Sequence, residues 1–216
     1  MMETGTVRPE RIDLDGRYVT LVPLSMAHAG DLWEGTSGEA NDGLWEYLPY
    51  GPYRSREAFD AQMAGMSRGD DPVFWAIIDK ATGKATGRAS LMRIDPPNRV
   101  IEVGGILYSP ALQRTKGATE AMYLMAKYSF DELGYRRYEW KCNALNQPSR
   151  AAALRLGFTY EGIFRQHMII KGQNRDSAWY SMLDSEWPAR KAAFEKWLAP
   201  ANFDAAGRQI SPLQRT

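Results

Sequence analysis

A short stretch in the middle of the chain carries residue types that could do chemistry. Glu102 lies in an apolar, strand-like run and is followed closely by the pair Gly104-Gly105. A carboxylate in apolar surroundings, where burial disfavours the charged form, is suited to taking up a proton. Two glycines inside a β-branched run indicate a bulge or the close approach of another group to the backbone. The stretch therefore predicts a candidate general base beside a bulge or a close approach to the backbone.

A basic loop comes next, with Arg114 and Lys116 just before a helical pattern that runs to Leu133. The first backbone N–H groups of a helix have no partner within it, and the helix dipole favours an anion at that end. The loop and helix together predict a site for a phosphorylated cofactor next to Glu102.

The rest of the sequence predicts the elements that position these residues. Strands are expected at 17–24, 73–78, 85–94, 100–108 and 137–144, and a closing hairpin at 159–170 and 176–184 with its turn at 171–174. Besides the helix ending near Leu133, helices are expected after Ser25, from Ser55 to about Met66, from about Asn146 to Gly157, and from Pro188 to about Leu198.

This order of elements predicts one mixed α/β (α+β) domain over residues 17–198. Residues 1–16 are expected to form a loosely ordered polar segment. Residues 199–216 lack periodicity and are expected to form a surface tail.

Composition narrows the classes of function. Hydrophobic residues make up 44% and charged residues 25% of the 216 residues, as in an ordinary globular protein. The net charge of +1 argues against nucleic acid or an anionic membrane as partner. The single cysteine, Cys142, and the absence of an apolar leader favour the cytoplasm. No membrane-span run and no metal-ligand spacing is found.

The element order and three motifs resemble the GNAT superfamily of acyl-CoA-dependent N-acyltransferases, and within it the RimJ/RimL-like branch. The motifs are Ile101-Glu102-Val103-Gly104 with residues 113–121, then 146–149, then 156–158. The resemblance covers roughly residues 17–187. It implies a GNAT-type fold, with a mostly antiparallel central sheet that is splayed in the middle and has helices on both faces. It also implies direct transfer of an acetyl group from acetyl-CoA to a primary amine.

The resemblance assigns cofactor contacts to individual residues. Backbone groups of Ile106, Leu107 and Tyr108 would pair with the pantetheine arm of coenzyme A and polarise the thioester carbonyl. Asn146 would bond the cofactor arm, and Arg150 would reach a phosphate. The pyrophosphate would be bound by the loop and first helical turn, which comprise Arg114, Thr115, Lys116, Gly117, Ala118 and Thr119.

This loop departs from the family pattern. When it is aligned on the run Ala118-Thr119-Glu120-Ala121, Lys116 stands where the family usually has a glycine. Either the Lys116 side chain points away from the phosphates or it adds its charge to them.

Glu102 is the expected general base, acting through a water molecule. Ser149 is the expected proton donor to the departing thiolate, and Tyr108 is the second candidate. The structural alternatives are that Glu102 forms an ion pair, for example with Arg99, and that Ser149 only caps a helix.

By the same resemblance, the acceptor side is formed by the aromatic loop 43–53 and the turn near 171–175. Packing beneath the loop is the alternative for its aromatic residues. The expected acceptor-binding residues are Trp45, Tyr47, Tyr50, Tyr53 and Arg175.

The acceptor is expected to be a protein N-terminal α-amine or a small amine such as an aminoacyl nucleotide. An α-amine, with a pKa of about 7.7–8.0, needs less help from a base than a lysine amine does. A non-catalytic CoA-sensing or protein-binding module on the same fold stays open as an alternative. Transfer of succinyl or longer acyl groups and a homodimeric assembly also stay open.

Overall fold

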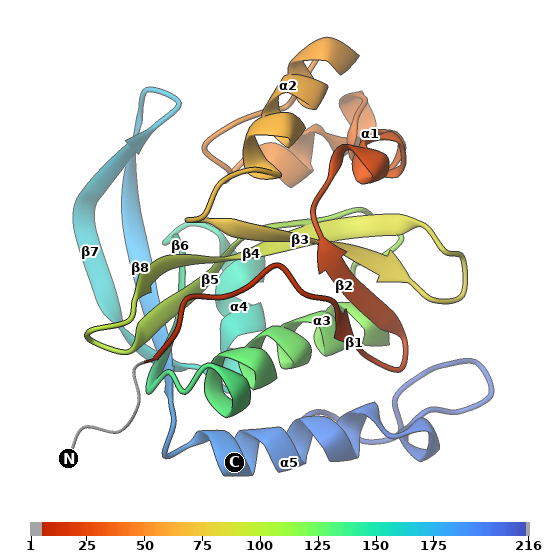
Figure 1. Cartoon of the computed structure of the whole chain (residues 1–216), viewed down its shortest axis with the longest axis vertical. Helices are drawn as coiled ribbons and strands as arrows, with labels where there is room; N and C mark the ends of the chain where they lie inside the picture. Colours follow the sequence, from red (N-terminus) through yellow and green to blue (C-terminus); the bar gives the residue numbers. More distant parts are fainter. Residues whose placement is uncertain (1–5, 215–216) are drawn as a thin grey trace.

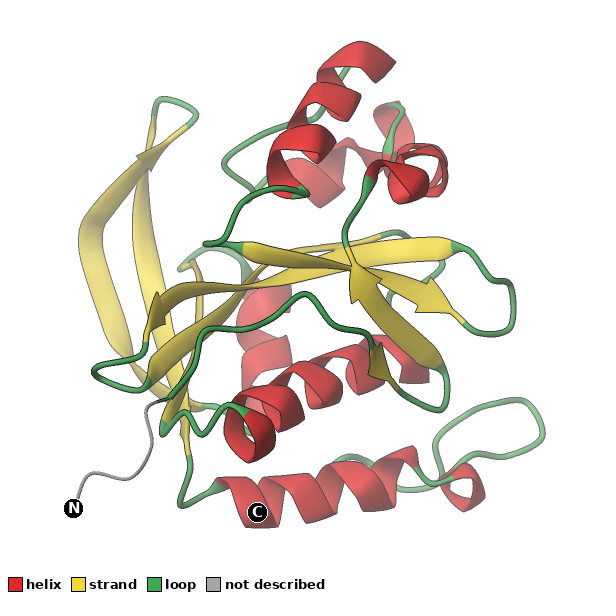
Figure 2. Cartoon of the chain, viewed as in Figure 1, coloured by secondary structure: helices red, strands yellow, loops and turns green. Residues whose placement is uncertain are grey.

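Among residues 6–214, which the computed structural model describes, eight strands form one sheet with helices on both faces (Figures 1 and 2). The order in space is β1-β2-β3-β4-β5-β6-β8-β7. In this described part, all neighbouring strands are antiparallel except β5 and β6, which are parallel. The strands are β1 (Leu14–Asp15), β2 (Val19–Pro23), β3 (Val73–Asp79), β4 (Ala85–Asp95), β5 (Val100–Tyr108), β6 (Arg137–Asn143), β7 (Thr159–Ile170) and β8 (Gln173–Leu183).

The helices divide between the two faces of the sheet. α1 (Ala29–Thr36) and α2 (Arg56–Met66) cover one face, and α3 (Lys116–Lys127) and α5 (Trp187–Leu198) cover the other (Figure 1). α4 (Gln147–Arg155) contributes to the same core as α3 and α5. Shorter turns are η1 (Met26–His28), η2 (Glu39–Trp45), the π-helical η3 (Tyr128–Glu132) and η4 (Pro200–Asn202). The expected mixed α/β fold is confirmed.

Each face of the sheet has its own apolar core. In β3, Trp75 packs into the core beneath α3, whereas Phe74 packs into the core beneath α1 and α2. Successive strand residues point to opposite faces, so an unbroken apolar run fits a strand that is covered on both sides. The expectation for residues 73–78 is therefore confirmed.

Residues 6–16 and 199–214, which flank the expected domain, contact it through a few buried side chains. The rest of the expected polar segment and surface tail, residues 1–5 and 215–216, lies outside the described residues. Leu14 in β1 is 7% exposed and Leu213 is 8% exposed. Trp197 Nε1 donates to Gln209 Oε1 at 2.9 Å, and the Trp197 ring meets the Phe203 ring edge-on. Single apolar residues anchor these segments, and they leave no periodic pattern in the sequence.

Candidate active site

Strands β5 and β6 are paired only over their first part. The parallel pairing ends at Val103 and Trp140, although β5 continues to Tyr108 and β6 to Asn143. Beyond this point no described strand pairs with β5 on its β6 side. The space along the unpaired backbone edge of residues 104–108 is called the gap below. The expected splay of the sheet is confirmed.

A bulge at Gly104-Gly105 accompanies this parting. The register between β4 and β5 shifts between Arg88 and Ser90. Gly105 has a φ of +59°, and a Cβ at this position would lie 2.7 Å from the Phe74 ring. Backbone conformation and packing both exclude a side chain here. The bulge predicted from the glycine pair is confirmed.

Arg88, which the sequence did not single out, holds the bulge in place. It is 1% exposed, and its Nη1 donates to the Gly105 carbonyl at 2.8 Å and to the Tyr50 hydroxyl at 3.2 Å. Its guanidinium lies over the rings of Tyr50 and Phe74. These contacts bring Tyr50, one of the expected acceptor-binding residues, to the edge of the gap.

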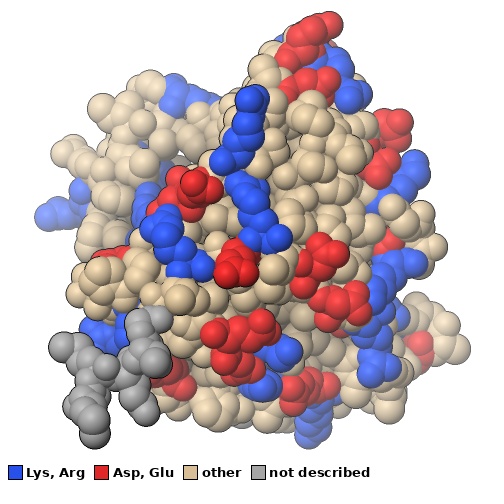
Figure 3. All heavy atoms as spheres, viewed as in Figure 1, with Lys and Arg blue, Asp and Glu red and all other residues tan. Residues whose placement is uncertain are grey.

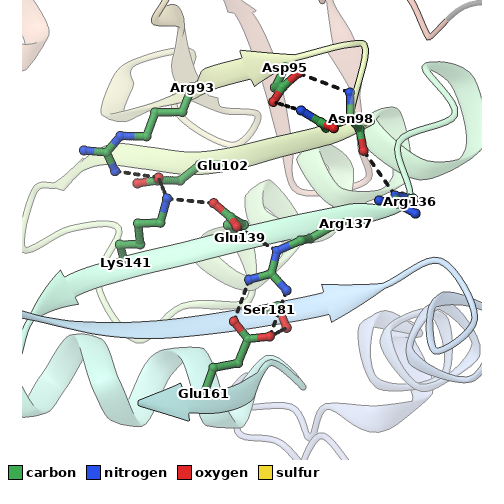
Figure 4. A network of polar contacts seen from close by, with 10 residues as sticks. All are labelled: Arg93, Asp95, Asn98, Glu102, Arg136, Arg137, Glu139, Lys141, Glu161 and Ser181. Carbon is green, nitrogen blue, oxygen red and sulfur yellow. Dashed lines mark hydrogen bonds and ion pairs between the residues drawn. The ribbon is translucent and has the colours of Figure 1, made fainter. Parts of the chain in front are cut away.

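Glu102 lies among charges. Its Oε2 accepts a hydrogen bond from Arg93 Nη1 at 2.7 Å and forms an ion pair with Lys141 Nζ at 2.9 Å (Figure 4). The expectation of apolar surroundings is therefore wrong, because Arg93 on β4 and Lys141 on β6 flank the carboxylate. The ion-pair alternative is correct in kind, but Arg99 is not the partner. Arg99 donates to the carbonyl of Gly134 instead.

The second carboxylate oxygen of Glu102 is turned toward the bulge. Oε1 has no hydrogen-bond partner within residues 6–214 and lies 3.5 Å from where a Cβ would stand on Gly104. The carboxylate is thus anchored through one oxygen and presents the other beside the gap. This arrangement can take a proton from a group held in the gap.

A chain of alternating charges extends from Glu102 across the sheet. Lys141 Nζ also contacts Glu139 at 2.7 Å, and Arg137 joins Glu139 to Glu161 (Figure 4). Residues 137, 139 and 141 share one face of β6 because alternate strand residues point the same way. The network fixes Lys141 from two sides.

The start of α3 offers fewer free groups than expected. The Thr115 hydroxyl caps the helix by accepting the Ala118 N–H at 3.1 Å, and Thr119 is 4% exposed. The Ala118 N–H is already bonded and Thr119 is buried, so neither is free for the cofactor contact that was expected of it. The N–H groups of Lys116 and Gly117 remain at the helix start, where no intrahelical acceptor exists.

The Lys116 side chain is directed at aromatic rings. Its Nζ lies 4.3 Å from the centre of the Tyr18 ring and 5.4 Å from that of Phe203. A Cβ on Gly117 would lie 2.9 Å from Val19, so this glycine allows α3 to pack closely on β2. The loop's lysine and glycine thus both serve packing within the chain.

Ser149 lies beside Trp140, where the β5–β6 pairing ends. Trp140 Nε1 donates to Ser149 Oγ at 3.0 Å, and Ser149 also contacts the Cys142 thiol, whose pKa is raised by burial. Because the hydroxyl accepts from the indole, its own hydrogen can be donated elsewhere. The helix cap is Asn146, whose Oδ1 accepts the Ser149 N–H at 3.0 Å. The capping alternative for Ser149 is wrong.

Two other expected site residues bond to the chain itself. The Tyr108 hydroxyl donates to the Ala118 carbonyl at 3.3 Å, and burial raises its pKa. Arg150 donates to the Ala144 carbonyl and to the Tyr180 hydroxyl, each at 3.2 Å. Both side chains already have partners before any ligand is considered.

The aromatic loop is mainly a packed structure. Trp45 is 1% exposed, and its Nε1 donates to the Thr36 carbonyl at 2.8 Å. Tyr53 and Phe59 meet the Trp45 ring edge-on, and Tyr47 is half-buried. The packing alternative is correct for Trp45, and its expected role as a wall of the acceptor site is wrong.

The turn of the closing hairpin reaches this loop. Lys171 Nζ donates to the Trp45 carbonyl at 2.8 Å. The turn comprises Lys171 and Gly172, both with positive φ, so β8 begins earlier than expected. Arg175 follows on β8, close enough to Glu102 for the carboxylate charge to affect its pKa. Of the expected acceptor-side residues, Tyr50 bonds to Arg88 beside the bulge, and Arg175 lies near Glu102.

Charges of both signs are interspersed over the face seen in Figure 3. Across residues 6–214, no group of His, Cys, Asp and Glu is arranged to hold a metal ion. In that same part of the chain, no helix is long and apolar enough to cross a membrane.

Known proteins share this architecture. The family described as "Acetyltransferase (GNAT) domain" matches residues 19–159. A crystal structure of a GCN5-related N-acetyltransferase from Brucella melitensis is 51% identical in sequence, with a TM-score of 0.96 over 99% of this chain and 97% of that one.

Further relatives point to one branch of the family. "Putative ribosomal N-acetyltransferase YdaF" of Bacillus subtilis (strain 168) is 34% identical over 111 residues, which are 50% of this chain and 59% of that relative. The similarity therefore spans little more than half of YdaF. A structure of RimL, ribosomal L7/L12 alpha-N-protein acetyltransferase, has the same fold at 19% identity, with a TM-score of 0.68 over 79% of this chain and 93% of that one. The chain belongs to the GNAT acetyltransferase family and resembles its RimJ/RimL-like branch.

Proposed function

We propose that this protein transfers the acetyl group of acetyl-CoA to a primary amine, with Glu102 as general base. The observation that supports this most strongly is the gap between β5 and β6 after Val103 and Trp140. The bulge at Gly104-Gly105 and the free oxygen of Glu102 both border it. An extended cofactor arm can pair with the unpaired β5 edge there as an added strand would.

The start of α3 fits the cofactor's diphosphate. The N–H groups of Lys116 and Gly117, the helix dipole and the exposed side chain of Arg114 would hold an anion there. Thr115 shapes this turn through its cap. The Lys116 ammonium lies over aromatic rings, so its side chain is not part of the proposed phosphate site. Bound here, acetyl-CoA would supply an acetyl group activated as a thioester.

The chain's own residues would move the protons. Glu102 Oε1 would accept a proton from the amine, directly or through a water, while Arg93 and Lys141 hold Oε2 in place. Ser149 would donate its proton to the departing thiolate, because its oxygen already accepts from Trp140. Tyr108 suits this role less well, since its hydroxyl donates to a carbonyl of α3.

The acceptor would be an α-amine, either of a protein N-terminus or of a small molecule. The name of the relative, "Putative ribosomal N-acetyltransferase YdaF", supports the first class. An α-amine with a pKa of about 7.7–8.0 is partly neutral at pH 7, so a single carboxylate base is enough.

A non-catalytic CoA-binding module is the second candidate function. The observation favouring it is the loop, in which Lys116 packs on aromatic rings and Gly117 packs on Val19. In the module, coenzyme A would bind without reaction.

Two measurements separate these functions. Calorimetric titration with acetyl-CoA tests binding, and free-thiol release with intact-mass detection over peptide and small-amine pools tests transfer. We expect micromolar binding together with acetylation of at least one α-amine. Binding without transfer over the whole panel would favour the module, and no binding would overturn both functions.

A further inference from the structure

Two arginines on the Glu102 side of the sheet lack a carboxylate partner, and they differ in their contacts. Arg88 donates to a carbonyl and a hydroxyl. The Arg175 side chain makes no hydrogen bond or ion pair with any residue of the described chain, and its Nε–H is buried without an acceptor. Burial lowers the pKa of Arg175. A half-buried cation without a counter-ion is stabilised when a ligand supplies one.

A second unpartnered donor lies on the same strand. Trp179 Nε1–H is buried and has no acceptor among the described residues. Arg175 and Trp179 share one face of β8, because strand residues four apart point the same way. That face is the Glu102 face, since the Trp179 ring lies 3.8 Å from Lys141 Nζ, which itself contacts Glu102.

The charges nearest Glu102 already balance one another. Arg93 and Lys141 pair with Glu102, and Lys141 and Arg137 pair with Glu139. Arg137 also pairs with Glu161, so three cations face three carboxylates. No carboxylate of the described chain is left to pair with the guanidinium of Arg175.

His167 on β7 lies close enough to Arg175 for this positive charge to affect the pKa of its imidazole. Burial lowers its pKa, and the nearby Arg93, Arg175 and Lys141 lower it further. The imidazole Nδ1 lies 2.9 Å from the Ser177 hydroxyl. The cations of three different strands thus act on one region beside the gap.

We propose that Arg175, together with the Trp179 N–H, binds a carboxylate that the acceptor carries close to its amine. This inference rests on the proposed acetyl transfer. A guanidinium fork matches a carboxylate with two parallel hydrogen bonds, and the Arg175 guanidinium, unlike that of Arg88, has no hydrogen-bond acceptor in the described chain. The carboxylate can be the α-carboxylate of an amino-acid-like amine or an acidic side chain beside a peptide N-terminus.

Matched acceptor pairs test the proposal and distinguish these two sources. The peptides Ser-Asp-Ala-amide and Ser-Asn-Ala-amide differ in one side-chain carboxylate, and L-phenylalanine and its amide differ in the α-carboxylate. We expect the wild-type kcat/KM to favour the acid of at least one pair by about tenfold or more, as a charge-assisted pair provides. Each amide has the same amine as its acid, and the amine of phenylalanine amide is the less basic, so amine reactivity would not produce this preference.

Arg175→Gln should reduce the preference to less than about threefold, mainly through the KM of the acid. Trp179→Phe, which keeps the ring, should reduce it in part. Arg165→Gln, an exposed arginine on the neighbouring β7, is the matched control and should leave the preference intact. A wild-type enzyme with no preference in either pair would overturn the proposal. Equal losses for acid and amide, or weaker acetyl-CoA binding in Arg175→Gln, would overturn it as well.

Binding separates this proposal from the proposed function. If no amine is acetylated, the same four acceptors can be titrated calorimetrically into the protein saturated with coenzyme A. Tighter binding of an acid that disappears in Arg175→Gln would support the carboxylate site without catalysis. Equal binding of acids and amides would overturn it. Circular dichroism should show a folded Arg175→Gln variant, since the Arg175 side chain makes no hydrogen bond or ion pair within the described chain.

Discussion

Lys141 Nζ lies 2.9 Å from Glu102 Oε2, and both side chains are 4% exposed. Lys141 Nζ also lies 2.7 Å from Glu139, so a second carboxylate holds the Lys141 ammonium in place. The pair therefore sets the position of Glu102 relative to the gap, while leaving Oε1 free within the described chain.

Replacing Glu102 by Gln should lower kcat/KM for the amine by about 10²–10⁴-fold, the usual contribution of a positioned general base. The remaining rate should rise with pH, because the amine must then lose its proton to solvent. Steady-state kinetics from pH 6 to about 10 measures both effects. Glu161→Gln, the same change at the outer end of the charge network, is the control and should retain the wild-type rate. An unchanged rate in Glu102→Gln with several amines would show that Glu102 is not the base.

Replacing Lys141 by Met should lower the free energy of unfolding by about 3–5 kcal/mol, since it leaves Glu102 and Glu139 buried without their shared cation. Urea unfolding followed by circular dichroism measures this loss. Lys191→Met removes the more exposed Lys191–Asp131 pair and should cost less than about 1 kcal/mol. Similar losses in the two variants would show that burial does not govern the contribution of Lys141.

Replacing Gly105 by Ala should lower the free energy of unfolding by about 2 kcal/mol or more, because it adds a positive-φ penalty and a contact with Phe74. Gly83→Ala also has a positive φ but meets nothing within 4 Å, and it should cost only about 1 kcal/mol. Calorimetry with acetyl-CoA should show weakened binding for Gly105→Ala alone. Unaltered binding would mean that the bulge does not shape the cofactor gap.

Replacing Lys116 by Met should lower the free energy of unfolding by about 1 kcal/mol through loss of the cation–π contacts with Tyr18 and Phe203. The Kd for acetyl-CoA and its salt dependence should stay near their wild-type values. Arg114→Gln should weaken binding and flatten the salt dependence, because that side chain is exposed at the loop. The reverse pattern would assign the phosphate contact to Lys116.

Acid should weaken the contribution of Glu161 to stability. A hydrogen bond from Arg137 lowers the pKa of Glu161 in the folded protein. A lowered folded-state pKa gives stability that is present above the unfolded value of about 4.3 and is lost as pH falls through the folded pKa. The difference in stability between wild type and Glu161→Gln should therefore be full near pH 6 and shrink steadily below about pH 4. Urea midpoints across this range measure it, and a difference that does not depend on pH would contradict the assignment.

Features that depend on local sequence were predictable. The glycine pair gave the bulge, since it fits a positive φ at residue 105. The unbroken apolar run of residues 73–78 predicted β3, and the helical spacing of apolar residues after the basic loop predicted α3. The position of Glu102 inside a strand followed in the same way.

The partners of Glu102 were not predictable in this way. Arg93 and Lys141 reach it from β4 and β6, and the β5–β6 register joins segments separated by a whole helix. The alternation of Arg137, Glu139 and Lys141 on one strand face was a signal, but it named no partner strand. The burial of Trp45 depends likewise on its bond to the Thr36 carbonyl, which no spacing rule indicates.

Lys116 sits between rings contributed by Tyr18, near the beginning of the chain, and Phe203, near its end. A ribosome delivers Phe203 only after the whole sheet has been synthesised, and domains generally fold as complete units. The turn that would receive the diphosphate therefore gains the Phe203 ring only after all eight strands have been synthesised. A nascent chain halted before residue 203 would carry this turn with only the Tyr18 ring beside Lys116.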